Sequence, residues 1–219
     1  MRNLNFNSEE QNKEMMDFMN IDLKDAISNG NHKKVDMNIS SGTIVLSNLW
    51  NTGPTYHHVI NQTFPKGIYP AYIFFGDIQA ILIDFAPEKL DALCLLSQRN
   101  MSQFEGDIMC FDANKLNPDL VTIEFRVNGT AISLMDVYSM KEYKAKKKQN
   151  PKDVQIAKVD TFVNTSLTED FVKLSPKHNC ILTKPYLGKG IYFEWVGMDL
   201  EDEIKFFLVD LHIKYTEVK

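Results

Sequence analysis

The chain has 219 residues, 44% hydrophobic and 24% charged, which is the composition of a globular protein that needs no metal or disulfide framework to build a core. The net charge of −5 argues against a dedicated nucleic-acid-binding protein, because such proteins carry a basic surface. No stretch resembles a signal peptide or a membrane span, so we expect a cytoplasmic protein that does not act at a membrane.

The cysteine content also indicates a cytoplasmic protein without a disulfide framework. Cys94, Cys110 and Cys180 are odd in number, lie far apart, and include no Cys-x-x-Cys pair. This arrangement argues against a disulfide framework and against a zinc knuckle. We therefore expect three free thiols in a reducing compartment, with no cofactor and no metal.

The first forty residues are predicted to form a helical segment. Met15, Met19, Leu23 and Ile27 recur at helical intervals, and Asn29-Gly30 supplies a helix-ending signal. Residues 41–219 read as a β-rich body. Because no linker or sharp change in composition divides the chain, we expect residues 1–219 to form a single domain.

Strand patterns dominate this body. We expect strands at 43–49, 68–75, 78–85, 108–111, 121–127, 130–135, 154–163, 181, 191–196 and 204–213. Gly76-Asp77 and Asn128-Gly129 are hairpin turn signals. Short helices are expected from Pro87 to Arg99 and after Asp136, the second running into the loop-like lysine stretch 144–152. The fold class is therefore α+β, mainly β, with an antiparallel sandwich-like or barrel-like core and a few peripheral helices.

A hairpin module occurs twice. Lys66-Gly67-Ile68-Tyr69 leads through an aromatic strand to a turn and then to Ile83-Asp84-Phe85. Lys189-Gly190-Ile191-Tyr192 leads in the same way to Val209-Asp210-Leu211. We interpret the match as an internal duplication and expect two related antiparallel hairpins, with Trp195 of the second copy buried in the core.

These motifs carry a resemblance to a known family. In order they are the strand at Ser41-Gly42, Pro65-Lys66-Gly67-Ile68-Tyr69, Met109-Cys110-Phe111-Asp112-Ala113, and Gly188-Lys189-Gly190-Ile191-Tyr192 followed by Val196-Gly197. The sequence resembles, over residues 40–213, the bacterial family called domain of unknown function four-two-four-one. The resemblance implies a bacterial, cytoplasmic, β-rich protein and implies no activity. Where that family tends to have an acidic residue in its last motif, this chain has Lys189.

Few residues suggest chemistry. Asp84 and Asp210 occupy matching positions in the two hairpins, and His212 follows Asp210 on the same predicted face, so a carboxylate could work with an imidazole in acid–base chemistry. Asp107, Cys110 and Asp112 form a second cluster. For both groups a structural role is the favoured interpretation.

The remaining candidates have weaker patterns. Adjacent histidines such as His57-His58 point to opposite faces of a strand, which disfavours a shared metal ion. The lysine run has no arginine and almost no aromatic residue, which favours a solvated loop over a nucleic-acid site; its members are Lys144, Lys146, Lys147, Lys148 and Lys152. We therefore assign no catalytic, cofactor-binding or metal residue.

Two functional classes remain. The first is a non-catalytic protein that binds a macromolecular partner, for instance an immunity protein that neutralises a toxin. Its acidic turn Glu201-Asp202-Glu203 would face a basic protein partner. The alternative is an enzyme or small-ligand binder that uses carboxylates between the two hairpins. A pocket lined by Asp84 and Asp210 would favour the alternative, and a broad acidic surface would favour the first class.

Overall fold

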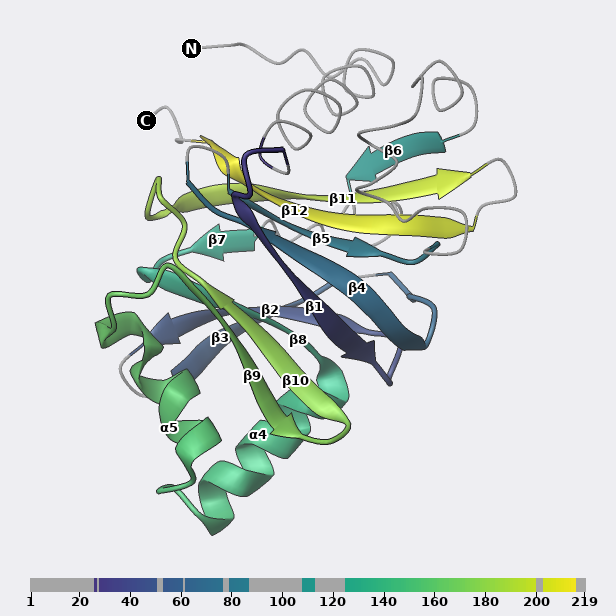
Figure 1. The fold of residues 1–219 in the computed structure, drawn as a ribbon. Helices are drawn as coiled ribbons and strands as arrows, with labels where there is room; N and C mark the ends of the chain where they lie inside the picture. Colours follow the sequence, from purple (N-terminus) through teal and green to yellow (C-terminus); the bar gives the residue numbers. More distant parts are fainter. Residues whose placement is uncertain are drawn as a thin grey trace.

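A computed structural model describes residues 26, 28–50, 53–60, 62–76, 79–86, 108–112, 125–199 and 203–215. Within this part of the chain the strands form two antiparallel sheets (Figure 1). The larger sheet has the order β1 (His32–Ile39), β4 (Gly67–Phe74), β5 (Ala80–Asp84), β12 (Ile204–Tyr215), β11 (Gly190–Asp199) and β6 (Ile108–Asp112), and β7 (Phe125–Val127) also pairs with β11. The smaller sheet has the order β3 (Gly53–Val59), β2 (Ile44–Trp50), β8 (Ala131–Asp136), β10 (His178–Thr183) and β9 (Glu169–Ser175).

The core lies between the two sheets. In the larger sheet, alternate residues such as Ile83 and Val209 belong to the apolar cluster, and in the smaller sheet Leu46 pairs in register with Leu134. This alternation is the pattern of an antiparallel sheet with one face on a core. The mainly β, antiparallel, sandwich-like prediction is confirmed. The barrel-like form is wrong, because the sheets do not close on themselves.

The two predicted hairpins are confirmed, and their registers match. Ala71 pairs with Ile83 in the first hairpin, and Glu194 pairs with Val209 at the equivalent position of the second. The second strands, β5 and β12, lie side by side at the centre of the sheet, with Leu82 opposite Leu208. An approximate two-fold axis at this pair therefore relates the two hairpins. Their origin by duplication stays a prediction.

Two helices and a short 3-10 turn cover the outer face of the smaller sheet: α4 (Val137–Gln149), α5 (Val154–Thr161) and η3 (Phe162–Asn164) (Figure 1). Asp136 caps α4 as predicted, since its carboxylate accepts a hydrogen bond from Tyr138 N at 2.8 Å. The lysine stretch is not a loop up to residue 149, because it forms the second half of α4.

The strand expected over residues 154–163 is wrong. Asp153 accepts hydrogen bonds from the backbone N–H groups of Gln155 and Ile156, which is an N-cap, and the segment forms α5 and η3. Ile156 and Val159, three residues apart, are buried on one helix face. Helix capping and packing therefore outweigh the strand preference of the β-branched residues.

The predicted N-terminal helical segment also needs a new boundary. Residues 32–39 form strand β1, because Met37 and Ile39 pack into the core while the whole strand pairs with β4. The turn before it contains Gly30, whose φ is 71°. The helical pattern at 15–27 lies almost entirely outside the described residues, as does the helix expected from Pro87 to Arg99.

The turn signal Asn128-Gly129 does not make a hairpin. β7 pairs with β11 in the larger sheet, whereas β8 pairs with β2 and β10 in the smaller one, so the chain crosses between sheets here. Asn48, in β2, holds the crossing: its side chain accepts from Asn128 N at 2.9 Å and donates to Arg126 O at 2.8 Å. The turn at Asn128-Gly129 therefore connects the two sheets instead of closing a hairpin.

A second buried asparagine ties the sheets and α4 together. Asn179, in β10, accepts a hydrogen bond from Asn38 N at 3.3 Å and donates one to Asp36 O at 3.0 Å, so its amide satisfies the outer backbone edge of β1. Its own backbone N donates to the Ser139 hydroxyl of α4 at 3.3 Å. Such satisfied buried polar groups fix the position of one layer on another.

Candidate functional site

Asp84 and Asp210 lie on the two central strands of the larger sheet, where the hairpins adjoin. Both belong to the face opposite the core and are buried, with side chains 1% and 2% exposed. Asp84 Oδ1 accepts a hydrogen bond from Ala86 N at 2.9 Å. Because Asp84 is opposite Phe206 and Asp210 is opposite Ala80, the two aspartates are offset by four residues, about 13 Å along the strand.

This offset limits what the two carboxylates can do together. Pairs of carboxylates that act on one glycosidic bond stand about 5–10 Å apart. Asp84 and Asp210 are therefore placed as two separate buried carboxylates. The side chain of His212 and the side chains of β6, which include Cys110 and Asp112, are outside the described ones, and so is Asp107.

The adjacent histidines lie on β3 and point to opposite faces, as the alternation of a strand predicts. His58 faces the core: its Nε2 is 3.1 Å from Glu194 Oε2 of the larger sheet. His57 faces the helices: its Nδ1 is 2.8 Å from the Ser47 hydroxyl. Within the described residues, no three or more His, Cys, Asp or Glu side chains are grouped so that they could hold a metal ion.

Polar side chains form a layer between the smaller sheet and its helices that we did not predict from the sequence. Besides Ser47 and His57, the Tyr143 hydroxyl donates to the Asp160 carboxylate, and Lys147 Nζ lies 2.9 Å from the other oxygen of Asp160. Only the spacing of Tyr143 and Lys147, four apart on α4, hints at this layer, because its other members come from distant parts of the chain.

The electrostatics of this layer favour neutral forms. Burial, and then the nearby charge of Lys144, lower the pKa of His57, so its imidazole is neutral near pH 7. Burial and the hydrogen bond to Asp160 raise the pKa of Tyr143. A serine hydroxyl beside a neutral imidazole can act as a nucleophile with the imidazole as its general base. Ser47, however, is 0% exposed, so in this arrangement its hydroxyl serves to satisfy the imidazole.

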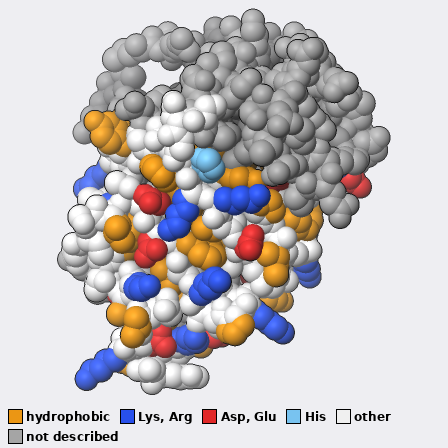
Figure 2. Space-filling model, in the orientation of Figure 1, with side chains coloured by type: hydrophobic (Ala, Val, Ile, Leu, Met, Phe, Trp, Pro, Cys, Tyr) orange, Lys and Arg blue, Asp and Glu red, His pale blue; other side chains and the backbone are white. Residues whose placement is uncertain are grey.

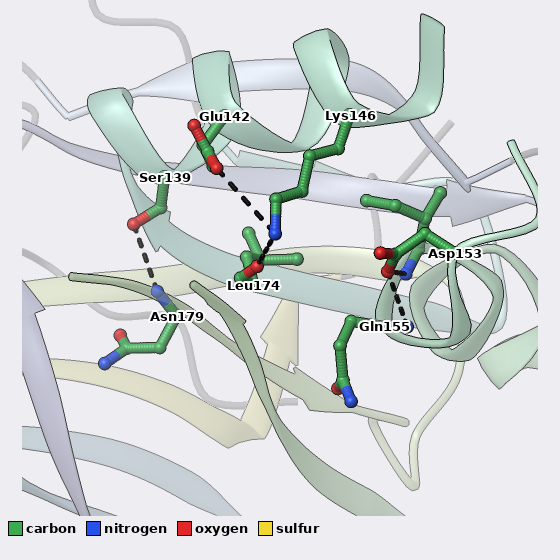
Figure 3. A network of polar contacts seen from close by, with 8 residues as sticks. Ser139, Glu142, Lys146, Asp153, Gln155, Leu174 and Asn179 are labelled. Atoms are coloured by element: carbon green, nitrogen blue, oxygen red, sulfur yellow. Dashed lines mark hydrogen bonds and ion pairs between the residues drawn. The ribbon is translucent and has the colours of Figure 1, made fainter. Parts of the chain in front are cut away.

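The lysines of α4 fall into two sets. Lys146 and Lys147 point back to the protein: Lys146 lies 3.8 Å from Glu142 and donates to the Leu174 carbonyl, as Figure 3 shows, and Lys147 pairs with Asp160. Lys141, Lys144 and Lys148 are exposed, and exposed Lys152 follows three residues after the helix ends. We call these four residues the lysine row.

The other residues singled out from the sequence are mostly structural. Trp195 is buried, as predicted, and Cys180 is a buried free thiol whose pKa is raised by burial. Cys94 lies outside the described residues, and Lys189 is exposed.

The acidic turn is only partly described. Glu203 is exposed and lies 2.7 Å from Lys205 Nζ, while residues 201 and 202 are outside the described part. On the face seen in Figure 2, acidic and basic side chains are interspersed rather than gathered by sign. That face is therefore not the broad acidic surface that a basic partner would need.

Comparisons with protein-family models, with curated proteins and with solved structures found nothing that matches this chain. The resemblance to domain of unknown function four-two-four-one therefore stays a prediction that rests on the short sequence motifs given above. None of the helices that the structure describes combines the length and the hydrophobicity needed to span a membrane.

Proposed function

We propose that this protein acts by binding a macromolecular partner rather than by turning over a substrate. One observation supports the proposal above the others: Ser47 and His58, which have catalytic potential, are buried in structural contacts, while charge is exposed on the helices. Ser47 satisfies His57, and His58 pairs with Glu194 inside the sandwich. Exposed charge on a rigid scaffold is suited to recognition.

The sequence gives one specific version of this proposal, an immunity protein that neutralises a basic toxin. Its support is the net charge of −5 and the acidic turn at residues 201–203. We propose that such a complex forms in the cytoplasm, and the free thiol of Cys180 supports this proposal.

The competing proposal is an enzyme or small-ligand binder that uses Asp84 and Asp210. Their burial favours it, because buried carboxylates cluster at functional sites. Their separation of about 13 Å along the strand disfavours joint chemistry at one bond. We therefore rank it second.

The test compares the two proposals on one sample. The tagged chain is purified at low salt from cells that express it naturally, the co-purifying protein is identified, and the complex is rebuilt from the purified components. We expect a stoichiometric complex that forms equally well with Asp84→Asn and with Asp210→Asn. Turnover of a substrate by the isolated chain, lost in either variant while its circular dichroism spectrum is unchanged, would replace binding with catalysis.

A further inference from the structure

We propose that the lysine row of α4 (Lys141, Lys144 and Lys148, continued by Lys152) docks an acidic segment of a protein partner. This inference rests on the proposed binding function and names the surface and the chemistry of the partner. It starts from the distribution of charge. Residues 137–189 contain eleven lysines and five acidic residues, a net charge of +6 in a chain of net charge −5. The rest of the chain therefore carries −11.

The row has a defined geometry on one face of the helix. At 100° and 1.5 Å per residue, Lys141, Lys144 and Lys148 lie within about 60° of one another and span about 10 Å along α4. An extended peptide places alternate side chains about 7 Å apart. Two or three alternate carboxylates of such a segment would therefore meet the row, with the flexible lysine side chains adjusting to them.

The opposite side of α4 keeps the row in place. Ser139 and Tyr143 are buried against the sheet, and Lys146 bonds to the carbonyl of Leu174 at the edge strand β9 (Figure 3). Lys147 pairs with Asp160 of α5. Because its neighbours hold the helix, the row is a preformed surface, and binding does not have to order the backbone that carries it.

A protein segment fits this surface better than a nucleic acid does. The strongly salt-dependent binding of nucleic acid is achieved by proteins that contact about six to ten phosphates, whereas the row offers four lysines. Residues 137–189 contain no arginine for bidentate contacts. The exposed aromatic side chain of α4, Tyr138, already packs against Lys141, with the ammonium 5.2 Å from the ring centre. A long polyanion would also run past the row onto a chain that is otherwise acidic.

The experiment measures fluorescence anisotropy of a labelled peptide of about eight glutamates, and of a labelled single-stranded oligonucleotide of about equal charge, at low and high salt. The row variant is Lys141→Glu/Lys144→Glu/Lys148→Glu. A control variant, Lys33→Glu/Lys66→Glu/Lys173→Glu, makes the same change of net charge at exposed lysines outside the two helices. If the row variant does not fold, Lys141→Gln/Lys144→Gln/Lys148→Gln replaces it.

We expect the glutamate peptide to bind the unchanged protein at low salt and to dissociate at high salt. The row variant should bind the peptide at least fivefold more weakly than the unchanged protein. The control variant should change the affinity less than twofold. Equal losses in both variants, or no peptide binding at low salt, would refute the inference. Tighter binding of the oligonucleotide than of the peptide would also refute it and would assign the row to nucleic acid. None of these results decides the capture experiment above, so the proposed function is tested separately.

Discussion

The buried pair of His58 and Glu194 provides a quantitative test of how the two sheets are held together. His58 Nε2 lies 3.1 Å from Glu194 Oε2, and the two side chains are 5% and 0% exposed. The imidazole also packs on Phe125, with ring centres 5.7 Å apart. His58→Leu leaves a buried carboxylate without this partner, and Glu194→Leu leaves the imidazole without it. Each single change should lower the free energy of unfolding by about 3–5 kcal/mol.

The double variant His58→Leu/Glu194→Leu should behave differently from the sum of the two. With both members of the pair removed, neither is left buried without the other, so we expect a free energy of unfolding near that of the unchanged protein or higher. Urea denaturation followed by circular dichroism measures all four proteins. Single changes that cost less than about 1 kcal/mol, or a double variant whose cost equals the sum of the single costs, would show that this pair does not join the sheets.

Three further predictions concern the helix side of the smaller sheet and the outer face of the larger sheet. Gly53 has φ +89°, and a Cβ there would overlap the Tyr143 hydroxyl and the Asp160 carboxylate. Gly53→Ala should therefore lower the free energy of unfolding, measured by thermal or urea denaturation, by about 2–4 kcal/mol. An unchanged denaturation curve would mean that these two groups do not lie against Gly53. Because the pKa of folded His57 is below its ordinary value of 6.5, the unfolded chain binds more protons, and His57 should contribute a loss of stability as pH falls through about 6.5 and below. Lys144→Gln should raise this pKa in a histidine NMR titration and Lys148→Gln should not; equal responses would remove Lys144 as a cause. Trp195→Ala should lower the free energy of unfolding by about 3–5 kcal/mol, because Trp195 is buried on the face of the larger sheet that carries Asp210; an unaltered denaturation curve would mean that this side chain is not buried there.

The parts of the fold that could be predicted depend on local signals. Gly67 and Gly190 each precede an Ile-Tyr strand opening, and apolar residues then continue through both strands, so the paired hairpins were evident from the sequence. Asp136 was recognisable as a helix cap for the same reason.

The parts that were missed depend on tertiary contacts. The β-branched residues of α5 imitate a strand, and only their packing against the sheet and the cap at Asp153 decide for a helix. Gly53-Pro54 reads as a turn, yet these residues begin strand β3.

The candidate sites were also predictable only where the signal was local in the sequence. The lysines of α4 were visible as a charge run, but the sequence did not separate Lys146 and Lys147, which bond back to the protein, from the exposed row. The layer joins Ser47 and His57 of the paired strands β2 and β3 to Tyr143 of α4, which lies far along the chain, so no local pattern predicts it.

The central claim is that the protein recognises a macromolecule through exposed charge, and the salt dependence of the rebuilt complex tests it most directly. The dissociation constant of the purified chain and its captured partner is measured by titration calorimetry between about 50 and 500 mM NaCl, with the row variant measured in parallel. The Debye length falls from about 14 Å to about 4 Å over this range, so we predict affinity that weakens steadily with salt and a shallower dependence for the row variant. A dissociation constant that does not change with salt would contradict recognition through exposed charge, and a substrate consumed by the chain alone would contradict the binding function itself.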